Sequence, residues 1–133
     1  MSEDKSNDTK HYILVADDDP AILRLVKTIV EKEGYVVETA RDGKEAYKLL
    51  QSGQSYAAAV FDVVMPYIQG TELVRYMQSE KRLMNIPVIM MTAEQSPRLS
   101  SDSFSAGAVA FLPKPFTTTQ LQAMLRMCVQ KGK

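Results

Sequence analysis

The sequence predicts an α/β fold, a doubly wound three-layer sandwich in which helices cover both faces of a parallel sheet. The first observation is alternation, because short apolar runs of strand length alternate about five times with segments of helical periodicity. The second is that these runs are continuously apolar, which is typical of strands buried on both faces. The third is a length of 133 residues without an internal repeat or interdomain linker, which fits one domain. Right-handed crossovers then favour the doubly wound topology.

The first strand and the first helix have the clearest boundaries. The run from Tyr12 to Ala16 predicts a buried strand, and three aspartates and Pro20 follow it. Asp19 stands where an N-cap is expected, with proline at the first helical position. Apolar residues then recur at helical spacing until Gly34, which predicts a left-handed helix stop.

Four more strand and helix pairs follow in the same order. The apolar or β-rich runs predict strands at residues 35–39, 56–61, 87–91 and 108–112. The predicted helices begin after capping-box spacing at Asp42 and Glu45, near Gly70, at the N-cap and proline of residues 96–97, and after a second capping box at Thr117 and Gln120.

Composition disfavours several functional classes, although a local basic patch stays open. Sixteen basic residues balance sixteen acidic ones, so the bulk charge indicates neither nucleic acid nor an anionic membrane as a partner. No stretch approaches the roughly 20 apolar residues of a membrane span. Residues 1–10 are polar and predict a disordered lead-in rather than a signal peptide, which leaves residues 11–133 as the domain. The single cysteine, Cys128, cannot form an internal disulfide, and this predicts a reducing, cytoplasmic location.

Carboxylates follow two of the predicted strands. Asp17, Asp18 and Asp19 follow the first strand, and Asp62 follows the run at residues 56–61. Ligands bind at the carboxyl edge of parallel α/β sheets, so these side chains are expected to meet there if the two strands are neighbours. Two unit charges about 4 Å apart at an effective dielectric of 20 interact by about 4 kcal/mol. The cluster therefore predicts either protonation or a hard divalent cation, and oxygen ligands favour Mg²⁺.

Two further polar residues follow later strands at the same edge. Thr92 directly follows the predicted fourth strand, and Lys114 lies beyond the fifth, between two prolines. A hydroxyl, an ammonium and a metal ion around one carboxylate would stabilise the charge on a transferring phosphoryl group. Asp62 would then be the nucleophile that becomes an acyl phosphate.

The chain resembles the receiver domains of response regulators in two-component signalling, from Tyr12 to Gln130. Four segments carry the resemblance, and they occur in the family's order: Ile-Leu-Val-Ala-Asp-Asp-Asp-Pro, Asp-Val-Val-Met-Pro-Tyr-Ile-Gln-Gly, Met-Thr-Ala and Gly-Ala-Val-Ala-Phe-Leu-Pro-Lys-Pro-Phe. The resemblance implies a flavodoxin-like (βα)5 fold with strand order 2-1-3-4-5. It also implies a cis bond between Lys114 and Pro115.

The resemblance implies a role for each residue of the site. Asp62 would accept a phosphoryl group from a phosphohistidine of a sensor histidine kinase or histidine phosphotransfer domain. Mg²⁺ would be bound, directly or through water, by Asp17, Asp18, Asp62 and the backbone carbonyl of Val64. Thr92 and Lys114 would sense the phosphoryl group.

The resemblance also implies how a signal would leave the site. The aromatic residue Phe111 would turn inward on activation and complete the switch with Thr92. The surface of the fourth helix, fifth strand and fifth helix would then engage an output domain or target protein. Such a protein is a switch that assists its own phosphoryl transfer and loss, not a turnover enzyme. Both a stand-alone receiver and one part of a larger regulator or hybrid kinase stay open.

Two local features refine this expectation. The resemblance implies that Val64 and Glu94 would flank the path of the hydrolytic water, and an apolar Val64 cannot orient water, which predicts slow self-dephosphorylation. The segment from Ser96 to Ala106 carries five serines, each costing several tenths of a kcal/mol against alanine in a helix, so the fourth helix should be marginal.

Three other functional classes compete with this interpretation. A Mg²⁺-dependent aspartyl phosphatase of the haloacid dehalogenase type uses a similar nucleophile, but its signature is matched only loosely from Asp17 to Ala21. A flavin or dinucleotide carrier shares the topology, but the first loop is acidic and lacks Gly-x-Gly-x-x-Gly. A phosphorylation-independent adaptor is disfavoured because the cluster is complete with Thr92 and Lys114.

Overall fold

One parallel sheet organises the computed structural model, which describes residues 11–94 and 96–129. The predicted lead-in at residues 1–10 lies outside the described residues. The strand order is β2-β1-β3-β4-β5, which confirms the predicted topology. The strands are β1 (Tyr12–Ala16), β2 (Val36–Ala40), β3 (Tyr56–Asp62), β4 (Val88–Thr92) and β5 (Ala110–Pro113).

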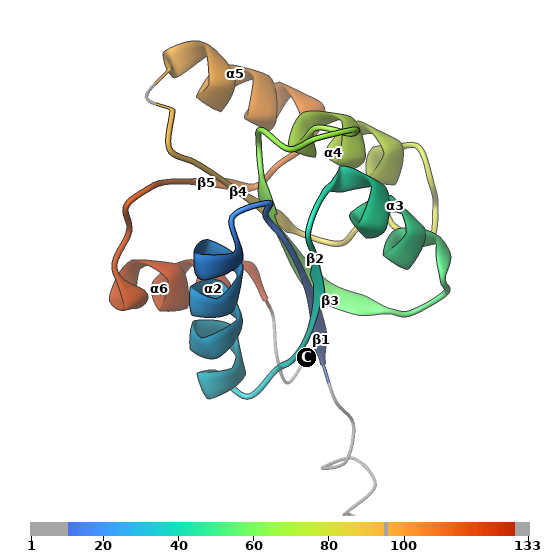
Figure 1. The fold of residues 1–133 in the computed structure, drawn as a ribbon. Helices are drawn as coiled ribbons and strands as arrows, with labels where there is room; N and C mark the ends of the chain where they lie inside the picture. Colours follow the sequence, from blue (N-terminus) through green and yellow to red (C-terminus); the bar gives the residue numbers. More distant parts are fainter. Residues whose placement is uncertain (1–10, 95, 130–133) are drawn as a thin grey trace, which may run out of the picture.

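Helices cover both faces of this sheet, as Figure 1 shows. In the described residues they are α2 (Pro20–Lys32), α3 (Gly43–Gln51), α4 (Gly70–Gln78), α5 (Pro97–Ala106) and α6 (Thr118–Cys128). Helices α2 and α6 pack on one face, and α3, α4 and α5 lie on the other. None of these helices combines the length and the apolar character that crossing a membrane requires.

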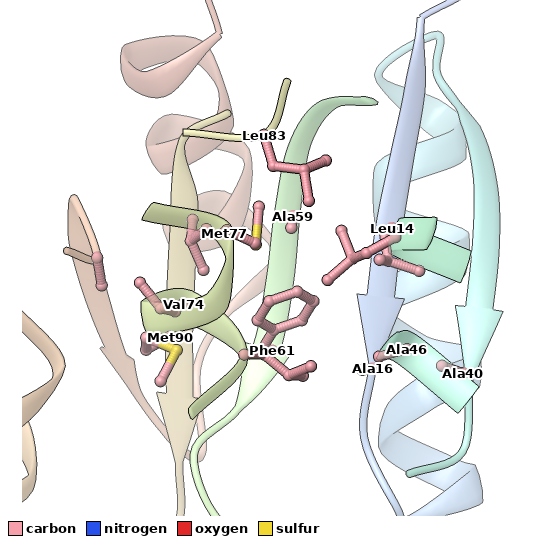
Figure 2. Packing of buried hydrophobic residues seen from close by; sticks show 14 of the residues in the cluster. Leu14, Ala16, Ala40, Ala46, Ala59, Phe61, Val74, Met77, Leu83 and Met90 are labelled. Carbon is pink, nitrogen blue, oxygen red and sulfur yellow. The ribbon is translucent and has the colours of Figure 1, made fainter. Parts of the chain in front are cut away.

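Two apolar clusters, one on each face, hold the layers together. On the α3–α5 side, Phe61 and Met90 from the sheet pack against Val74 and Met77 of α4, as seen in Figure 2. On the other side, side chains of the central strands pack against the apolar faces of α2 and α6. Because alternate residues of β3 enter opposite clusters, both of its faces are buried, as the continuous apolar run predicted.

Side-chain caps fix where the helices begin. Asp19 accepts a hydrogen bond from the Ala21 N–H at 2.9 Å, so the predicted N-cap of α2 is confirmed. The capping box of α6 is also confirmed, since Thr117 and Gln120 exchange hydrogen bonds of 2.8 and 3.0 Å.

The capping box predicted for α3 is only half correct. Asp42 accepts from the Glu45 N–H at 2.8 Å, but Glu45 accepts in return from the N–H of Arg41 rather than from that of Asp42. The Arg41 guanidinium also contacts Glu45 at 3.0 Å, and this ion pair draws the carboxylate one residue back along the chain.

The boundaries of four strands also differ from the prediction by one or two residues. The second strand spans residues 36–40 instead of 35–39, and the third ends at residue 62 instead of 61. The fourth spans residues 88–92 instead of 87–91, and the fifth spans residues 110–113 instead of 108–112. Ala108 is excluded from the fifth strand because its N–H donates to the Ser103 carbonyl at 3.0 Å and so closes the end of α5.

Candidate functional site

Backbone hydrogen bonds extend the sheet one residue past several strands, and this fixes the polar residues at its carboxyl edge. The N–H of Asp17 donates to the Ala40 carbonyl at 3.2 Å. Beyond the ends of β4 and β5, the N–H of Lys114 donates to the Thr92 carbonyl at 2.8 Å. Asp62 is the last residue of β3, between β1 and β4. The strand order therefore brings together residues that are up to 97 positions apart in the sequence.

Three carboxylates meet at this edge. One oxygen from each of Asp17, Asp18 and Asp62 lies within 4.8 Å of the other two. Asp17 is fully buried and Asp62 is 6% exposed, whereas Asp18 is exposed. This is the juxtaposition that the sequence predicted for the ends of the first and third strands.

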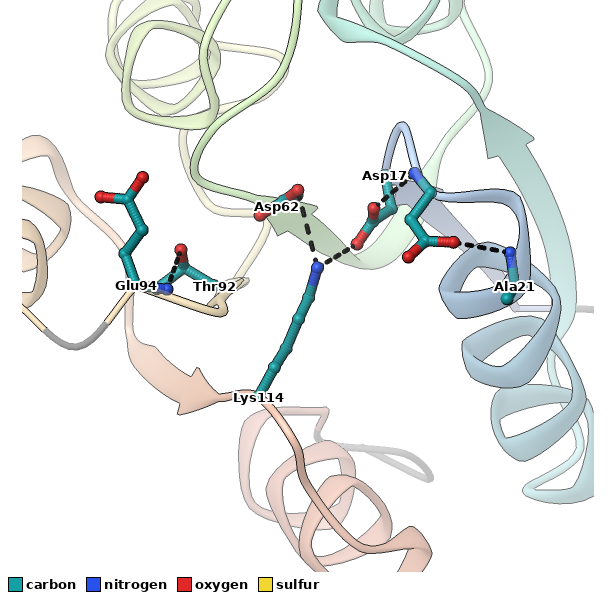
Figure 3. A network of polar contacts seen from close by, with 7 residues as sticks. Asp17, Ala21, Asp62, Thr92, Glu94 and Lys114 are labelled. Carbon is teal, nitrogen blue, oxygen red and sulfur yellow. Dashed lines mark hydrogen bonds and ion pairs between the residues drawn. The ribbon is translucent and has the colours of Figure 1, made fainter.

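The Lys114 ammonium lies between two of these carboxylates, as Figure 3 shows. Its Nζ is 2.8 Å from Oδ2 of Asp17 and 3.6 Å from Oδ2 of Asp62. The lysine side chain is only 12% exposed, so little water screens this contact. The other Asp17 oxygen accepts from the Asp19 N–H at 2.8 Å, which fixes the orientation of the Asp17 carboxylate.

Asp62, the predicted nucleophile, binds a proton more tightly than an exposed aspartate does. Burial and the neighbouring Asp17 carboxylate raise the pKa of Asp62 from 3.8 to about 6, and Asp18 adds to this effect. Lys114 and a backbone hydrogen bond from Val64 act in the opposite direction. Asp62 is therefore mostly ionised at neutral pH, but it stays more basic than an exposed aspartate.

Thr92 and Phe111 lie on adjacent strands beside this cluster. The Thr92 hydroxyl accepts from the Glu94 N–H at 3.1 Å, which leaves its own proton available for donation to a ligand. Phe111 is half-buried, and the centre of its ring is 6.4 Å from that of Phe104 on α5. Phe111 also lines a surface pocket of about 320 Å³ with residues of the loop before α5.

The donor set fits a hard divalent cation. The candidate ligands are all oxygens, and the Val64 carbonyl accepts no hydrogen bond from the described residues. Oxygens bound about 2.1 Å from Mg²⁺ in octahedral geometry lie about 3 to 4 Å from one another, a span close to the one observed. The four predicted ligands thus have the right chemistry, and the cluster could bind a metal ion.

Most of the predicted site residues meet at one edge, and two features of it were not predicted. The Lys114–Pro115 bond is cis, as the resemblance implied. The contact between Lys114 and Asp17 was not predicted, because no local pattern encodes a distance across four strands; the prediction placed Lys114 against a phosphoryl oxygen. The backbone conformation of Tyr67, which has a φ of 71° in the loop after Asp62, was not predicted either.

Comparisons with known proteins agree with this geometry. The sequence model of the response regulator receiver domain family matches residues 13–126 of this chain. Response regulator MprA of Mycolicibacterium vanbaalenii is 36% identical over 119 residues, which cover 90% of this chain and 50% of that protein. The chain therefore spans about half the length of the curated relatives that it matches.

Solved structures show the same similarity. Chemotaxis protein CheY4 of Vibrio cholerae superposes with a TM-score of 0.83 at 30% identity, with coverage of 91% of this chain and 100% of that one. The receiver domain of sensor histidine kinase PA1611 from Pseudomonas aeruginosa superposes with a TM-score of 0.82 at 25% identity, over 90% of this chain and 98% of that one. That structure has a magnesium ion coordinated in its active-site cleft.

Proposed function

Because the chain belongs to the response regulator receiver domain family of two-component signalling, we propose that it is a Mg²⁺-dependent phosphoryl acceptor whose acceptor residue is Asp62. Receiver domains work with sensor histidine kinases and output domains. The observation that carries the proposal is the buried convergence of Asp17, Asp62 and Lys114, with ammonium–carboxylate distances of 2.8 and 3.6 Å.

In the proposed reaction, one Asp62 oxygen attacks the phosphorus of a phosphohistidine. A phosphorus–oxygen bond forms, the phosphorus–nitrogen bond breaks, and the leaving imidazole takes a proton from water. Without a metal ion the pKa of this carboxyl is about 6, so Asp62 is mostly ionised at neutral pH and is available as a nucleophile. Bound Mg²⁺ would neutralise phosphoryl charge, and Asp17, Asp18, Asp62 and the Val64 carbonyl would hold it.

Two side chains would then bind the new phosphoryl group. The Lys114 ammonium is already 3.6 Å from Asp62 and would donate to one phosphoryl oxygen. The Thr92 hydroxyl would donate to another phosphoryl oxygen, because its own oxygen accepts from the Glu94 N–H and its proton stays available. Movement of Thr92 would let Phe111 turn inward and change the surface formed by α5, β5 and α6. The protein would act as a switch for an output partner rather than as a turnover enzyme.

Labelling by a small phosphodonor tests this proposal. The chain is incubated with phosphoramidate and Mg²⁺, and the products are read by intact-mass and peptide mass spectrometry. We expect one phosphoryl group per chain on Asp62, loss of the label with hydroxylamine, and no label in Asp62→Asn. Absence of label on the wild-type chain would refute phosphoryl acceptance and favour a phosphorylation-independent adaptor. Catalytic turnover of the donor without a retained acyl phosphate would favour an aspartyl phosphatase.

A further inference from the structure

A strained, solvent-exposed tyrosine lies in the loop that follows Asp62. Tyr67 has a φ of 71°, and it is the one residue other than glycine with a positive φ in the described part of the chain. The Pro66 carbonyl accepts from the Ile68 N–H at 2.8 Å, so Tyr67 is the central residue of a tight three-residue turn. The residue is 76% exposed, so burial of the ring does not explain the conformation.

Two close backbone contacts hold this loop in place. A Cβ atom at Gly43, the first residue of α3, would lie 1.8 Å from the Ile68 carbonyl oxygen. A Cβ atom at Gly70, the first residue of α4, would lie 2.5 Å from the Asp62 carbonyl oxygen. Because the loop contacts α3 on one side and the end of β3 on the other, the surrounding structure maintains the strained turn. Backbone strain that is maintained in this way is found most often at binding sites.

Tyr67 is also close enough to Asp62 to lie inside any protein interface centred on that residue. Two residues separate Tyr67 from Gly70, so their Cα atoms are at most about 11 Å apart, and Gly70 packs against the Asp62 carbonyl. A standard interface covers about 800 Å² on each partner, equivalent to a disc with a radius of about 16 Å. A protein that delivers a phosphoryl group to Asp62 through an interface of this size would therefore also cover Tyr67 and Val64, which is 41% exposed.

The chemistry of this surface suits a partner with an apolar contact beside an acidic group. Tyrosine supplies a large contact area with few rotatable bonds, which makes it a frequent hot-spot residue. The Lys44 Nζ is 5.6 Å from the centre of the Tyr67 ring, and no carboxylate of the described residues pairs with that ammonium. A partner carboxylate could pair with Lys44 while an apolar side chain packs on the ring.

We propose that Tyr67 is a docking and specificity residue for the protein that donates the phosphoryl group, and this rests on the proposed function of Asp62. The donor would present an apolar side chain and a carboxylate next to its phosphohistidine. Tyr67 would have no role in the chemical step itself. Replacement of Tyr67 should therefore slow phosphoryl transfer from a protein donor but not from a small phosphodonor.

The test compares two donors on four chains. Phosphoramidate is the small donor, and the protein donor is the purified histidine kinase or phosphotransfer domain of the source organism that labels the wild-type chain fastest. The variants are Tyr67→Gly and Tyr67→Asn, which both tolerate the positive φ, and Met84→Ala, an exposed residue before β4 at the opposite edge of the sheet. Thermal unfolding verifies that each variant is folded.

We expect both Tyr67 variants to lose about tenfold in kcat/KM with the protein donor and to stay within about twofold of wild type with phosphoramidate. Met84→Ala should match the wild type with both donors. Equal kcat/KM with the protein donor, or equal losses with both donors, would overturn the docking role. So would failure of every protein donor to label a chain that phosphoramidate labels. If phosphoramidate itself fails on the wild-type chain, the proposed function is the part refuted.

Discussion

The buried Asp62 carboxylate should destabilise the metal-free fold at neutral pH, and Asp62→Asn should remove this cost. The folded chain binds the Asp62 proton more tightly than the unfolded chain, because burial and Asp17 raise its pKa from 3.8 to about 6. The contribution of Asp62 to the free energy of unfolding therefore falls as the pH rises from about 4 to about 6 and is level above that. The difference between 3.8 and about 6 corresponds to about 3 kcal/mol. Because the site lies at the carboxyl edge of the sheet, solvent screens part of the charge and this figure is an upper bound.

Urea unfolding of the EDTA-treated chain measures this effect. We expect Asp62→Asn to exceed the wild type by up to about 3 kcal/mol in unfolding free energy at pH 7.5, and by much less at pH 4. Asp102→Asn is the matched control, because Asp102 is an exposed acid on α5 whose ion pair with Arg98 is long, at 3.9 Å. The reasoning is refuted if the Asp62 variant is no more stable than this control at pH 7.5, or if its advantage is as large at pH 4.

Three further predictions concern the neighbours of this carboxylate. Lys114→Met should lower the free energy of unfolding of the metal-free chain by about 3 kcal/mol at pH 7.5, because it leaves the buried Asp17 without its cation. Urea unfolding measures this, and a smaller loss of unfolding free energy than in Lys32→Met would contradict it. Val64→Asn should shorten the phosphoryl lifetime by up to about tenfold, because an amide can orient the hydrolytic water; an unchanged rate of label loss would refute this. Amide hydrogen exchange in α5 should be at least about tenfold faster than in α2, since the only buried residues of α5 are Ser103 and Ala106. Equal protection of the two helices would contradict the prediction that α5 is only marginally stable.

Much of the fold could be predicted because local signals and burial agree. The continuous apolar run of β3 predicted a strand buried on both faces, and Asp19 followed by Pro20 predicted the start of α2. The candidate site could be predicted for a related reason. Parallel strands all end at one edge, so residues that follow Ala16 and Phe61 must meet wherever β1 and β3 are neighbours.

The features that could not be predicted depend on contacts between distant elements. Lys114 lies nearer to Asp17 than to Asp62, a choice set by the relative positions of β1, β3 and β5. The strained turn at Tyr67 is maintained by the close approach of Gly43 to Ile68, which a reading of neighbouring residues cannot reveal. Where a cross-sheet ion pair or a loop contact decides the outcome, local sequence patterns carry no signal for it.

The coupling of metal, phosphoryl group and switch can be measured in one NMR experiment. Beryllofluoride, a stable mimic of the phosphoryl group, is added to the ¹⁵N-labelled chain with Mg²⁺ or with EDTA. We expect new amide positions at Thr92, at Phe111 and across α5, β5 and α6 only when Mg²⁺ is present, and none in Asp18→Ala. Identical spectra with and without Mg²⁺, or an unperturbed Thr92 in its presence, would contradict a metal-dependent phosphoaspartate switch.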